Sequence, residues 1–595
     1  MRRLGGRRRS TDSTRRQRLS GVFALLDPAG VDHVATLAAL ASVEFRGKPY
    51  LRSSGAVAVG TYVDEEASSR VREQNHRLVA TDTTINGPVP DTRAAWHAHG
   101  LTGSDFLEST LHELGPAELI GVAGDYVVAS ADPAQRRIIV ARDAFGSRPL
   151  FWAHRGDVHA FASDVEVLLS LGLATGDLDP EVVSAYLAID SLGDDHAGRT
   201  AFAGVRTVLA GHWVEVEVGR EPREKRWFEP SRLAPPSLSG RSAVSAVHDV
   251  LVEATAARAA GRTVGLQLSG GRDSGAIAVA LRHAGIDALC LTYEFDPAVQ
   301  QSETELARSL AERLRHDWMP VPCDVPDQDE LDLIPWGAGT PMVAPSWSLY
   351  LRLRRSAESA GIDLMLTGDG GEPLFQASPR SVVDLLRAGR VRDAASTARN
   401  FQRSWGYPYG VQLKGAMRLM APRRLVEARE RARAIPPWVV DRVSKHREPV
   451  IELWRERDRL VRDLTSPEVY SHDFGERLGR RHSMGQGSPM LDLRVLRVVL
   501  GLPLELRAPV SAPKPALREA LLQSNAADRV KMSLGPYVLH TAISLQREQR
   551  DLFAPDSLSV QAGFVRSDGL DALGKPEWLM YSINLAMVES WMRSV

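Results

Sequence analysis

The sequence has few of the groups on which several common kinds of protein chemistry depend. Its 595 residues include only two cysteines, Cys290 and Cys323, which excludes a disulfide framework and a cluster of thiolate metal ligands. Lys and Arg number 73 and Asp and Glu 74, so no net field attracts nucleic acid. No uninterrupted apolar run is long enough to cross a bilayer. We therefore expect a cytoplasmic protein that has no membrane span and binds no nucleic acid.

The N-terminal segment also lacks apolar residues. The first eighteen residues, MRRLGGRRRSTDSTRRQR, contain eight arginines. A secretory signal needs an apolar stretch after its basic start, and GVFALLDPAG is too short and too interrupted to supply one. We interpret residues 1–19 as a basic, disordered tail.

The remaining chain divides by its pattern of apolar residues. Residues 20–227 contain short β-branched or aromatic runs between turn residues, such as YVVASAD and PLFWAHRG, which predict an α+β layered domain. Residues 228–240 are rich in Pro, Ser and Gly and are interpreted as a linker. In residues 241–595, strands alternate with helices and a mostly helical region follows, which favours a parallel, doubly wound α/β sheet.

One turn stands out where the first strand of that sheet ends. The stretch VGLQLSGGRDSGAIAVAL, residues 264–281, is an apolar strand, then paired glycines, then a helical pattern. Gly270 and Gly271 let phosphate oxygens approach the backbone, while Ser269 and Ser274 add hydroxyl donors beside the free N–H groups of the next helix. The lysine of a Walker loop is absent, and so is the G-x-G-x-x-G pattern of a dinucleotide fingerprint. The turn therefore predicts a pyrophosphate site of another type.

Asp273 has two interpretations at this turn. Its carboxylate can accept N–H groups as a helix cap. It can also bind Mg²⁺, a hard ion that prefers carboxylate and phosphate oxygens. The residues alone leave both open.

These motifs carry a resemblance to a known family. SGGRDS after an apolar strand resembles the PP-loop of the N-type ATP pyrophosphatases. RDAFGSRPLFW, LMLTGDGGEPLF, MGQGSPMLDLRVLRVVLGLP and KPALREALLQSNAADRVKMSLG are similar, in the same order, to segments of the asparagine-synthetase-like amide-forming enzymes. The resemblance runs from about residue 20 to residue 540. It implies a glutaminase-like (Ntn-type) sandwich over 20–227, followed by a PP-loop synthetase domain over 241–595 that is similar to the adenine nucleotide alpha hydrolases and uses ATP and Mg²⁺.

The sequence departs from this family at the glutaminase nucleophile. A working domain of this type begins with a cysteine that attacks glutamine and releases ammonia. Ser20 stands at that position, and both cysteines lie in the other domain. The glutamine-binding loops are also hard to find in TDTTINGPVPDTRAAW. We expect a glutaminase-like domain without glutaminase chemistry, so the amine must come from elsewhere, most simply from the substrate itself.

Intramolecular amide formers of this family include β-lactam synthetases and the lasso peptide macrolactam synthetases. LTGDGGEPLFQASPRSVVDLLRAGRVRDA resembles the latter most. This implies a linear core peptide as substrate and, as partners, a leader-peptide-binding protein and a leader peptidase. An Asp or Glu side chain of the peptide is adenylated and then attacked by the peptide's N-terminal amine, releasing AMP and pyrophosphate. The alternatives are a β-lactam-type synthetase, an asparagine synthetase that uses free ammonia, and a non-catalytic scaffold that binds nucleotide or peptide.

The resemblance assigns phosphate and metal roles to two motifs. The pyrophosphate ligands it implies are Ser269, Gly270, Gly271 and Ser274. The Mg²⁺ ligands it implies are Asp273 and Glu372, although relatives commonly have Asp at the second position.

Five further positions follow from the same resemblance. Thr367 and Gly368 match residues that line the ribose and adenine, and Thr292 is a weaker candidate. Asp369 matches a residue close to the reacting acyl group, where it orients or deprotonates the amine or else caps a helix. Lys531 matches the late lysine that neutralises phosphate charge. Lys514 competes with it, but we expect Lys514 to be a surface residue before its helix.

Overall fold

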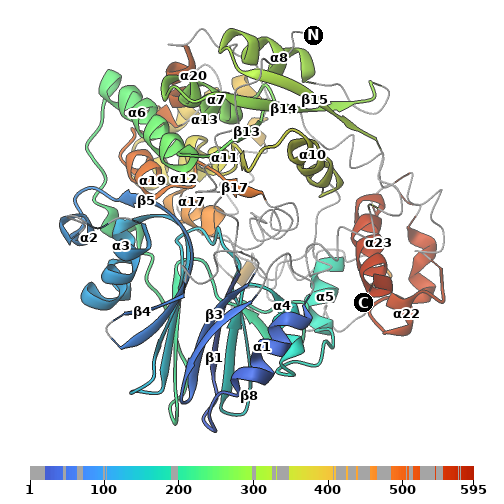
Figure 1. Ribbon diagram of the computed structural model, residues 1–595. Helices are drawn as coiled ribbons and strands as arrows, with labels where there is room; N and C mark the ends of the chain where they lie inside the picture. Colours follow the sequence, from blue (N-terminus) through green and yellow to red (C-terminus); the bar gives the residue numbers. More distant parts are fainter. Residues whose placement is uncertain are drawn as a thin grey trace, which may run out of the picture.

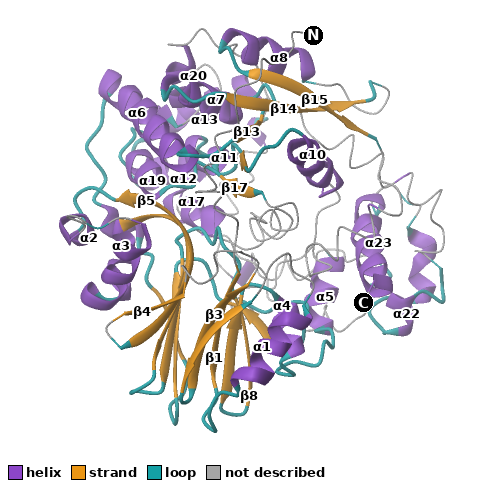
Figure 2. Cartoon of the chain, in the orientation of Figure 1, coloured by secondary structure: helices purple, strands orange, loops and turns teal. Residues whose placement is uncertain are grey.

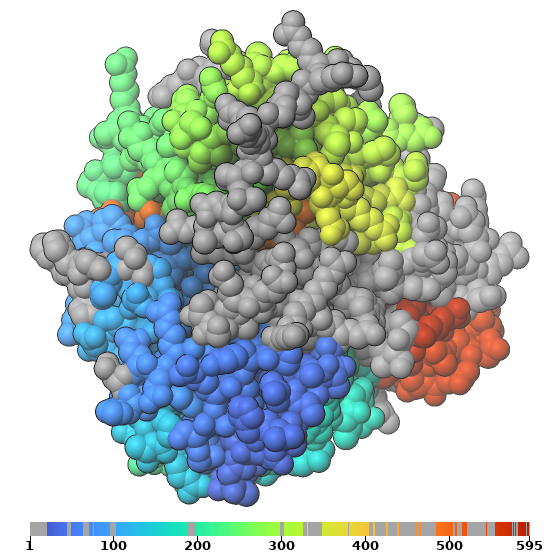
Figure 3. Space-filling model, viewed as in Figure 1, coloured from blue at the N-terminus to red at the C-terminus, as the bar shows by residue number. Residues whose placement is uncertain are grey.

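The computed structural model describes most of the chain. The described residues are 21–43, 49–62, 71–74, 76–97, 101, 103–188, 198–297, 303–324, 330, 347–378, 380–405, 408–410, 424–425, 437–439, 456–465, 484–503, 506–507, 514–522, 543, 554–573, 575 and 578–594. Ser20, Lys531 and the basic tail 1–19 lie outside them. Two domains follow one another in sequence, the sandwich domain (blue to teal) and the parallel-sheet domain (green to orange) (Figure 1). Both appear on the face shown in Figure 3.

The sandwich domain consists of two antiparallel six-stranded sheets (Figure 2). The first has the order β10-β8-β9-β1-β3-β2, with β1 Gly21–Leu26, β2 Tyr50–Ser54, β3 Val57–Tyr62, β8 Phe151–Arg155, β9 Val158–Ala162 and β10 Val205–Thr207. The second has the order β12-β11-β7-β6-β5-β4, with β4 Val71–Gln74, β5 Arg77–Pro88, β6 Val122–Asp132, β7 Arg137–Arg142, β11 His212–Glu217 and β12 Arg223–Arg226.

Helices cover the outer faces of this sandwich. Alternation along β1 sends Val22 and Ala24 into the core between the sheets and Phe23 and Leu25 into a core shared with α1 and α4. Because both faces of β1 are buried, its run GVFALL is continuously apolar. The helical elements are α1 His33–Ser42, α2 Arg93–His97, α3 Gly103–Ser109, η2 Thr110–Leu114, η3 Pro116–Gly121, α4 Val165–Ser170 and α5 Pro180–Leu187. The predicted α+β layered domain is confirmed.

The parallel-sheet domain has the order β15-β14-β13-β16-β17, and every paired strand is parallel. Its strands are β13 Val264–Gln267, β14 Ala288–Phe295, β15 Asp317–Cys323, β16 Leu364–Leu366 and β17 Gly485–Gly487. The chain builds outward from β13 to β15 and then returns to the other side of β13 with β16. The crevice beyond the carboxyl ends of β13 and β16 is therefore the topological switch point, where ligands bind in such sheets.

Helices of this domain pack around the sheet. They are α6 Gly240–Ala259, α7 Arg272–His283, α8 Thr304–Arg313, α10 Trp347–Ser359, α11 Gly371–Phe375, α12 Arg380–Arg387, α13 Val391–Trp405, α17 Glu456–Thr465, α19 Leu493–Leu500 and α20 Pro515–Leu522. In the described part of the chain, no helix has the length and apolar character needed to cross a membrane.

Two segments tie the domains together. The segment 228–240 contains the 3-10 helix η5 Pro230–Leu233, and Leu233 is fully buried in a core that both domains share. The C-terminal elements α22 Leu558–Gln561, η8 Ser567–Ala572 and α23 Leu579–Ser594 lie beside the sandwich domain (Figure 1). There α23 packs on α5, and Asn584 Nδ2 donates to Tyr186 O at 2.8 Å. The end of the chain thus contacts the first domain as well as the second.

Candidate active site

The turn after β13 is shaped by its glycines and serines. Gly270 has φ +71°, and a Cβ there would lie 3.0 Å from Leu306 at the start of α8, so only glycine fits without strain. Ser274 Oγ lies 3.1 Å from both Ser269 N and Ser269 Oγ, and Gly271 N donates to Ser269 Oγ at 3.3 Å. This closed turn leads directly into α7, whose first N–H groups point out of its N-terminal end.

Asp273 lies in the first turn of α7 and forms an ion pair with Lys514. Its other oxygen, Oδ1, is buried and has no hydrogen-bond partner in the described part of the chain. The expectation that Lys514 is a surface residue is therefore wrong. The backbone of Lys514 has φ +51° just before α20. Its side chain is only 11% exposed and reaches Asp273, beside the turn that follows β13. The role expected of Lys531 stays a prediction, because that residue lies outside the described part.

The turn after β16 packs directly against the first turn. A Cβ at Gly368 would lie 2.8 Å from Ser274 N, and one at Gly371 would lie 2.5 Å from Asp273 Cγ. The two motifs, almost a hundred residues apart in sequence, therefore meet at the switch point. The structure places Ser269, Gly270, Gly271, Asp273, Ser274, Thr367, Gly368 and Asp369 together at this edge of the sheet.

Asp369 is held in place by its neighbours. Its Oδ2 accepts a hydrogen bond of 2.7 Å from Thr367 Oγ1, and its backbone oxygen accepts one of 2.6 Å from Ser488 Oγ. The negative charge of Asp369, together with burial, raises the pKa of Tyr350 well above its usual range. Tyr350 lies on α10, and sequence analysis missed it because WSLYLRLRR shows only an amphipathic helix.

Two predicted residues lie at the margin of this arrangement. Thr292 is buried in β14, where its hydroxyl donates to Leu268 O at 2.8 Å and accepts from Trp318 Nε1 at 3.0 Å, so it joins neighbouring strands. Glu372 is exposed on α11, and its Oε1 accepts a hydrogen bond of 3.4 Å from Gln376 Nε2. Nucleotide binding by Thr292 and metal binding by Glu372 stay predictions.

A magnesium ion fits one residue here better than the other. Asp273 Oδ1 packs against Gly371 and has no hydrogen-bond partner in the described part of the chain, so it is the oxygen of this carboxylate that is left to bind a cation. Within the described residues, no group of three or more His, Cys, Asp or Glu side chains could hold a metal by themselves. Phosphate oxygens would therefore have to complete the coordination of Mg²⁺.

Both cysteines of the chain lie in the parallel-sheet domain, on β14 and β15. Burial raises the pKa of the Cys290 thiol and of the Cys323 thiol to about 12. Since the thiolate is the reactive form, burial disfavours both cysteines as nucleophiles.

The start of the sandwich domain is closely packed. A Cβ at Gly21 would lie 2.2 Å from the Tyr62 ring, and Tyr62 Oη donates a hydrogen bond of 3.2 Å to Asp164 Oδ2.

Comparisons with known proteins agree with this domain order. Residues 93–228 match the glutamine amidotransferase domain. Amidase chyE of Penicillium rubens is 25% identical over 311 residues, which cover 48% of this chain and 44% of that protein. A Mycobacterium tuberculosis protein named as a glutamine-hydrolysing asparagine synthetase is 27% identical over 282 residues, covering 44% and 41%. Glutamine-hydrolysing asparagine synthetase 2 of Bacillus subtilis is 21% identical over 472 residues, covering 73% and 59%.

The matched part is less than two thirds of the length of each of these relatives. Residues 246–593, more than half of the chain, match the asparagine synthase family, and they contain both turns of the candidate site and Lys514. The chain belongs to the asparagine synthase family.

Proposed function

We propose that this protein uses ATP to form an amide bond within one linear peptide, closing the isopeptide-linked ring of a lasso peptide. The observation that carries the proposal is the combination of the glycine- and serine-containing turn around Asp273 and Lys514 with two thiols that are both buried. The first supports activation of a carboxylate by ATP. The second argues against release of ammonia from glutamine by a cysteine of this chain, so an amine on the substrate is the simplest nucleophile.

The reaction has two steps. In the first, a side-chain carboxylate of the peptide attacks the α-phosphorus of ATP, a new O–P bond forms, and the bond to the leaving pyrophosphate breaks. The Ser269–Ser274 turn and the ammonium group of Lys514 would hold the pyrophosphate and neutralise its charge. In the second, the N-terminal amine attacks the acyl carbon, a C–N bond forms, and AMP leaves.

Mg²⁺ bound at Asp273 would neutralise charge on the phosphates during the first step. Asp369 is the proposed acceptor of the proton that the amine loses in the second step. Its carboxylate lies beyond the end of β16, beside the turn that would hold the phosphates, and Thr367 Oγ1 fixes one of its oxygens. The other interpretation of Asp369, a cap for α11, is not supported, because no side chain caps that helix.

The choice of a lasso precursor as substrate rests on the segment that follows the second turn. There α12 and α13 are separated by a turn containing Gly389, with φ +72°, which fits the helix and glycine of DLLRAGRVRDA. A leader-peptide-binding protein and a leader peptidase remain the partners that this substrate implies. The second candidate, synthesis of asparagine from aspartate and free ammonia, is favoured by the names of the mycobacterial and Bacillus relatives.

The test is to incubate the full-length protein with ATP, Mg²⁺ and candidate linear peptides that carry Asp or Glu within the first residues after a free N-terminus. We expect AMP to form together with a peptide that has lost the mass of one water. In a parallel reaction, aspartate and ammonium chloride replace the peptide. Asparagine formed there, with every peptide left unchanged, would instead support the second candidate. AMP formation in neither reaction would contradict both.

A further inference from the structure

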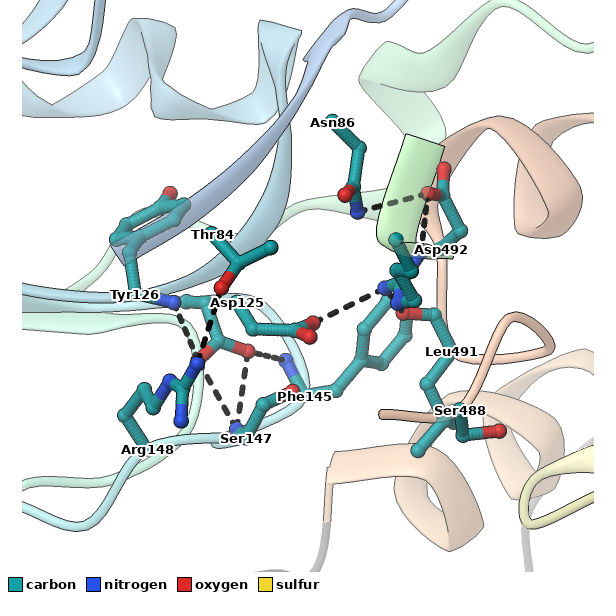
Figure 4. Close-up of polar contacts among 12 residues, drawn as sticks. Thr84, Asn86, Asp125, Tyr126, Phe145, Ser147, Arg148, Ser488, Leu491 and Asp492 are labelled. Carbon is teal, nitrogen blue, oxygen red and sulfur yellow. Dashed lines mark hydrogen bonds and ion pairs between the residues drawn. The ribbon is translucent and has the colours of Figure 1, made fainter. Parts of the chain in front are cut away.

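The two domains are joined by a buried set of charged side chains. Arg258, on α6 of the parallel-sheet domain, donates from Nη2 to Asp125 Oδ1 on β6 of the sandwich domain at 3.0 Å. Its Nη1 donates to Asp492 Oδ2, at the N-terminus of α19, at 2.8 Å. The three side chains are 1%, 6% and 0% exposed. Figure 4 shows Asp125 on β6 and Asp492 beside Leu491.

Arg494 supplies the second positive charge that this set needs, because Arg258 alone faces two carboxylates. Burial alone would raise the pKa of Asp492, but the guanidinium groups of Arg494 and Arg258 hold it well below its usual range. Asn86 Nδ2, from β5 of the sandwich domain, also donates to Asp492 Oδ2 at 3.3 Å (Figure 4). Removing one partner of a buried ion pair strongly destabilises the folded protein, because it leaves the other charge buried and unpaired. Each of these charged side chains therefore needs the others in order to stay buried.

Arg258 also contacts the backbone that precedes Asp492. Its Nη2 donates to Leu491 O at 2.9 Å. Its aliphatic stem lies against Gly487, where a Cβ would be 3.3 Å from Arg258 Cδ. The segment 487–492 is thus held at both ends by a single side chain.

The same segment supports the turn after β16 from its other side. Ser488 Oγ donates to the backbone oxygen of Asp369 at 2.6 Å. The Leu491 side chain packs over Gly370, where a Cβ would lie 2.5 Å from Leu491 Cδ2 and where φ is +84°. Gly487 O accepts a hydrogen bond of 3.0 Å from Thr367 N. The position of Asp369 therefore depends on where the segment 487–492 lies.

We propose that Arg258 is a positioning residue through which the sandwich domain fixes the Asp369 turn of the active site. Asp125 fixes the position of the Arg258 guanidinium, which in turn hydrogen-bonds the segment 487–492. Ser488 and Leu491 of that segment then contact Asp369 and Gly370. This gives the glutaminase-like domain a task that needs no glutaminase chemistry. The effect on turnover rests on the proposed function, whereas the effect on the turn itself does not.

The decisive variant is Asp125→Asn, measured by amide hydrogen–deuterium exchange on the full-length protein. Asp125 makes none of the hydrogen bonds described above to the segment 487–492 or to the Asp369 turn, and Arg258 is the side chain that links it to both. The amide keeps the size of the side chain and removes its charge. We expect exchange in residues 487–492 and 364–371 to become at least about tenfold faster, because the charge pairing that closes this region is lost.

Asp91→Asn is the matched control. Asp91 also belongs to the sandwich domain and pairs with Arg497 on α19, but its side chain is 69% exposed and the contact does not reach the segment 487–492. Its φ of +59° is one that Asn tolerates. We expect this variant to exchange like the wild type in both segments. Equal exchange in Asp125→Asn and Asp91→Asn would overturn the proposal.

Two further measurements keep the outcomes distinct. If Asp125→Asn does not fold, as judged by thermal unfolding, Ser488→Ala replaces it, because it removes the contact with Asp369 without leaving a charge unpaired. It must then accelerate exchange in 364–371, and unchanged exchange would contradict the proposal. In the peptide assay, Asp125→Asn should lower kcat by on the order of tenfold or more with little change in the KM for ATP. A wild type that makes no AMP refutes the proposed function and leaves the exchange result to decide this inference.

Discussion

Replacing Gly371 by alanine tests whether the Asp273 carboxylate must keep its position. Gly371 begins α11, and its φ lies outside the left-handed region, so alanine is compatible with the backbone and favours the helix by up to about 1 kcal/mol. The added methyl group, however, would lie 2.5 Å from Asp273 Cγ and 2.6 Å from Asp273 Oδ1. The substitution should therefore leave the fold stable while it disturbs one side chain of the site.

The size of the disturbance follows from these distances. An ordinary contact begins at 3.4 Å, so the Asp273 carboxylate must move by about 0.9 Å. The Asp273 carboxylate has little room to move, because Gly368 packs against the same side chain. A Cβ at Gly368 would lie 3.0 Å from Asp273 Cβ. A displacement of about 1 Å in a catalytic site can lower the rate by about a hundredfold, or ~2.7 kcal/mol in transition-state free energy.

The assay is AMP formation from ATP and the linear peptide, with binding of MgATP measured separately by calorimetry. Gly410→Ala is the control, because a Cβ at Gly410 meets no atom within 4 Å. If Gly371→Ala acts only through Asp273, it should have no further effect in an Asp273→Ala background. A rate in Gly371→Ala within about threefold of the wild type, or an undiminished effect in that background, would refute the reasoning.

Three other changes have defined outcomes. Lys514→Met should raise the Kd for MgATP about ten- to a hundredfold, because one charge-assisted hydrogen bond to phosphate is lost, while calorimetry on Lys575→Met, an exposed lysine, should show no change. Lys531→Ala should lower kcat severely and leave peptide binding intact, since charge develops only during the reaction; an undiminished rate would assign the task to Lys514 alone. Burial raises the pKa of Glu108 from 4.5 to about 7, so the folded protein keeps a proton that the unfolded chain releases, and the free energy of unfolding should fall by roughly 3 kcal/mol between those pH values. Glu108→Gln should abolish that fall in urea unfolding measured from pH 4.5 to pH 8, and parallel profiles for the two proteins would contradict the assignment.

The sequence was sufficient wherever local chemistry decides the structure. Gly270, between a buried strand and a helix, predicted a turn, and only a residue without Cβ can take φ +71° against the start of α8. Short strand-like runs predicted β13, β14, β15 and β16, whereas the loss of glutaminase chemistry stays a prediction because Ser20 lies outside the described residues. That the turns after β13 and β16 meet was decided by the strand order, which places β16 beside β13.

Only the tertiary structure decided which distant side chains complete the site. In its own segment, Lys514 resembles a solvated lysine. Its left-handed backbone just before α20 nevertheless directs its side chain to Asp273, which lies 241 positions earlier in the chain. Arg258 lies on α6, whose sequence shows only an ordinary amphipathic helix. Its two carboxylate partners come from β6 and from the start of α19. Strand and helix periodicities report the few neighbours that each residue has along the chain. Pairing of buried charges depends on how whole domains dock, and no local pattern carries that information.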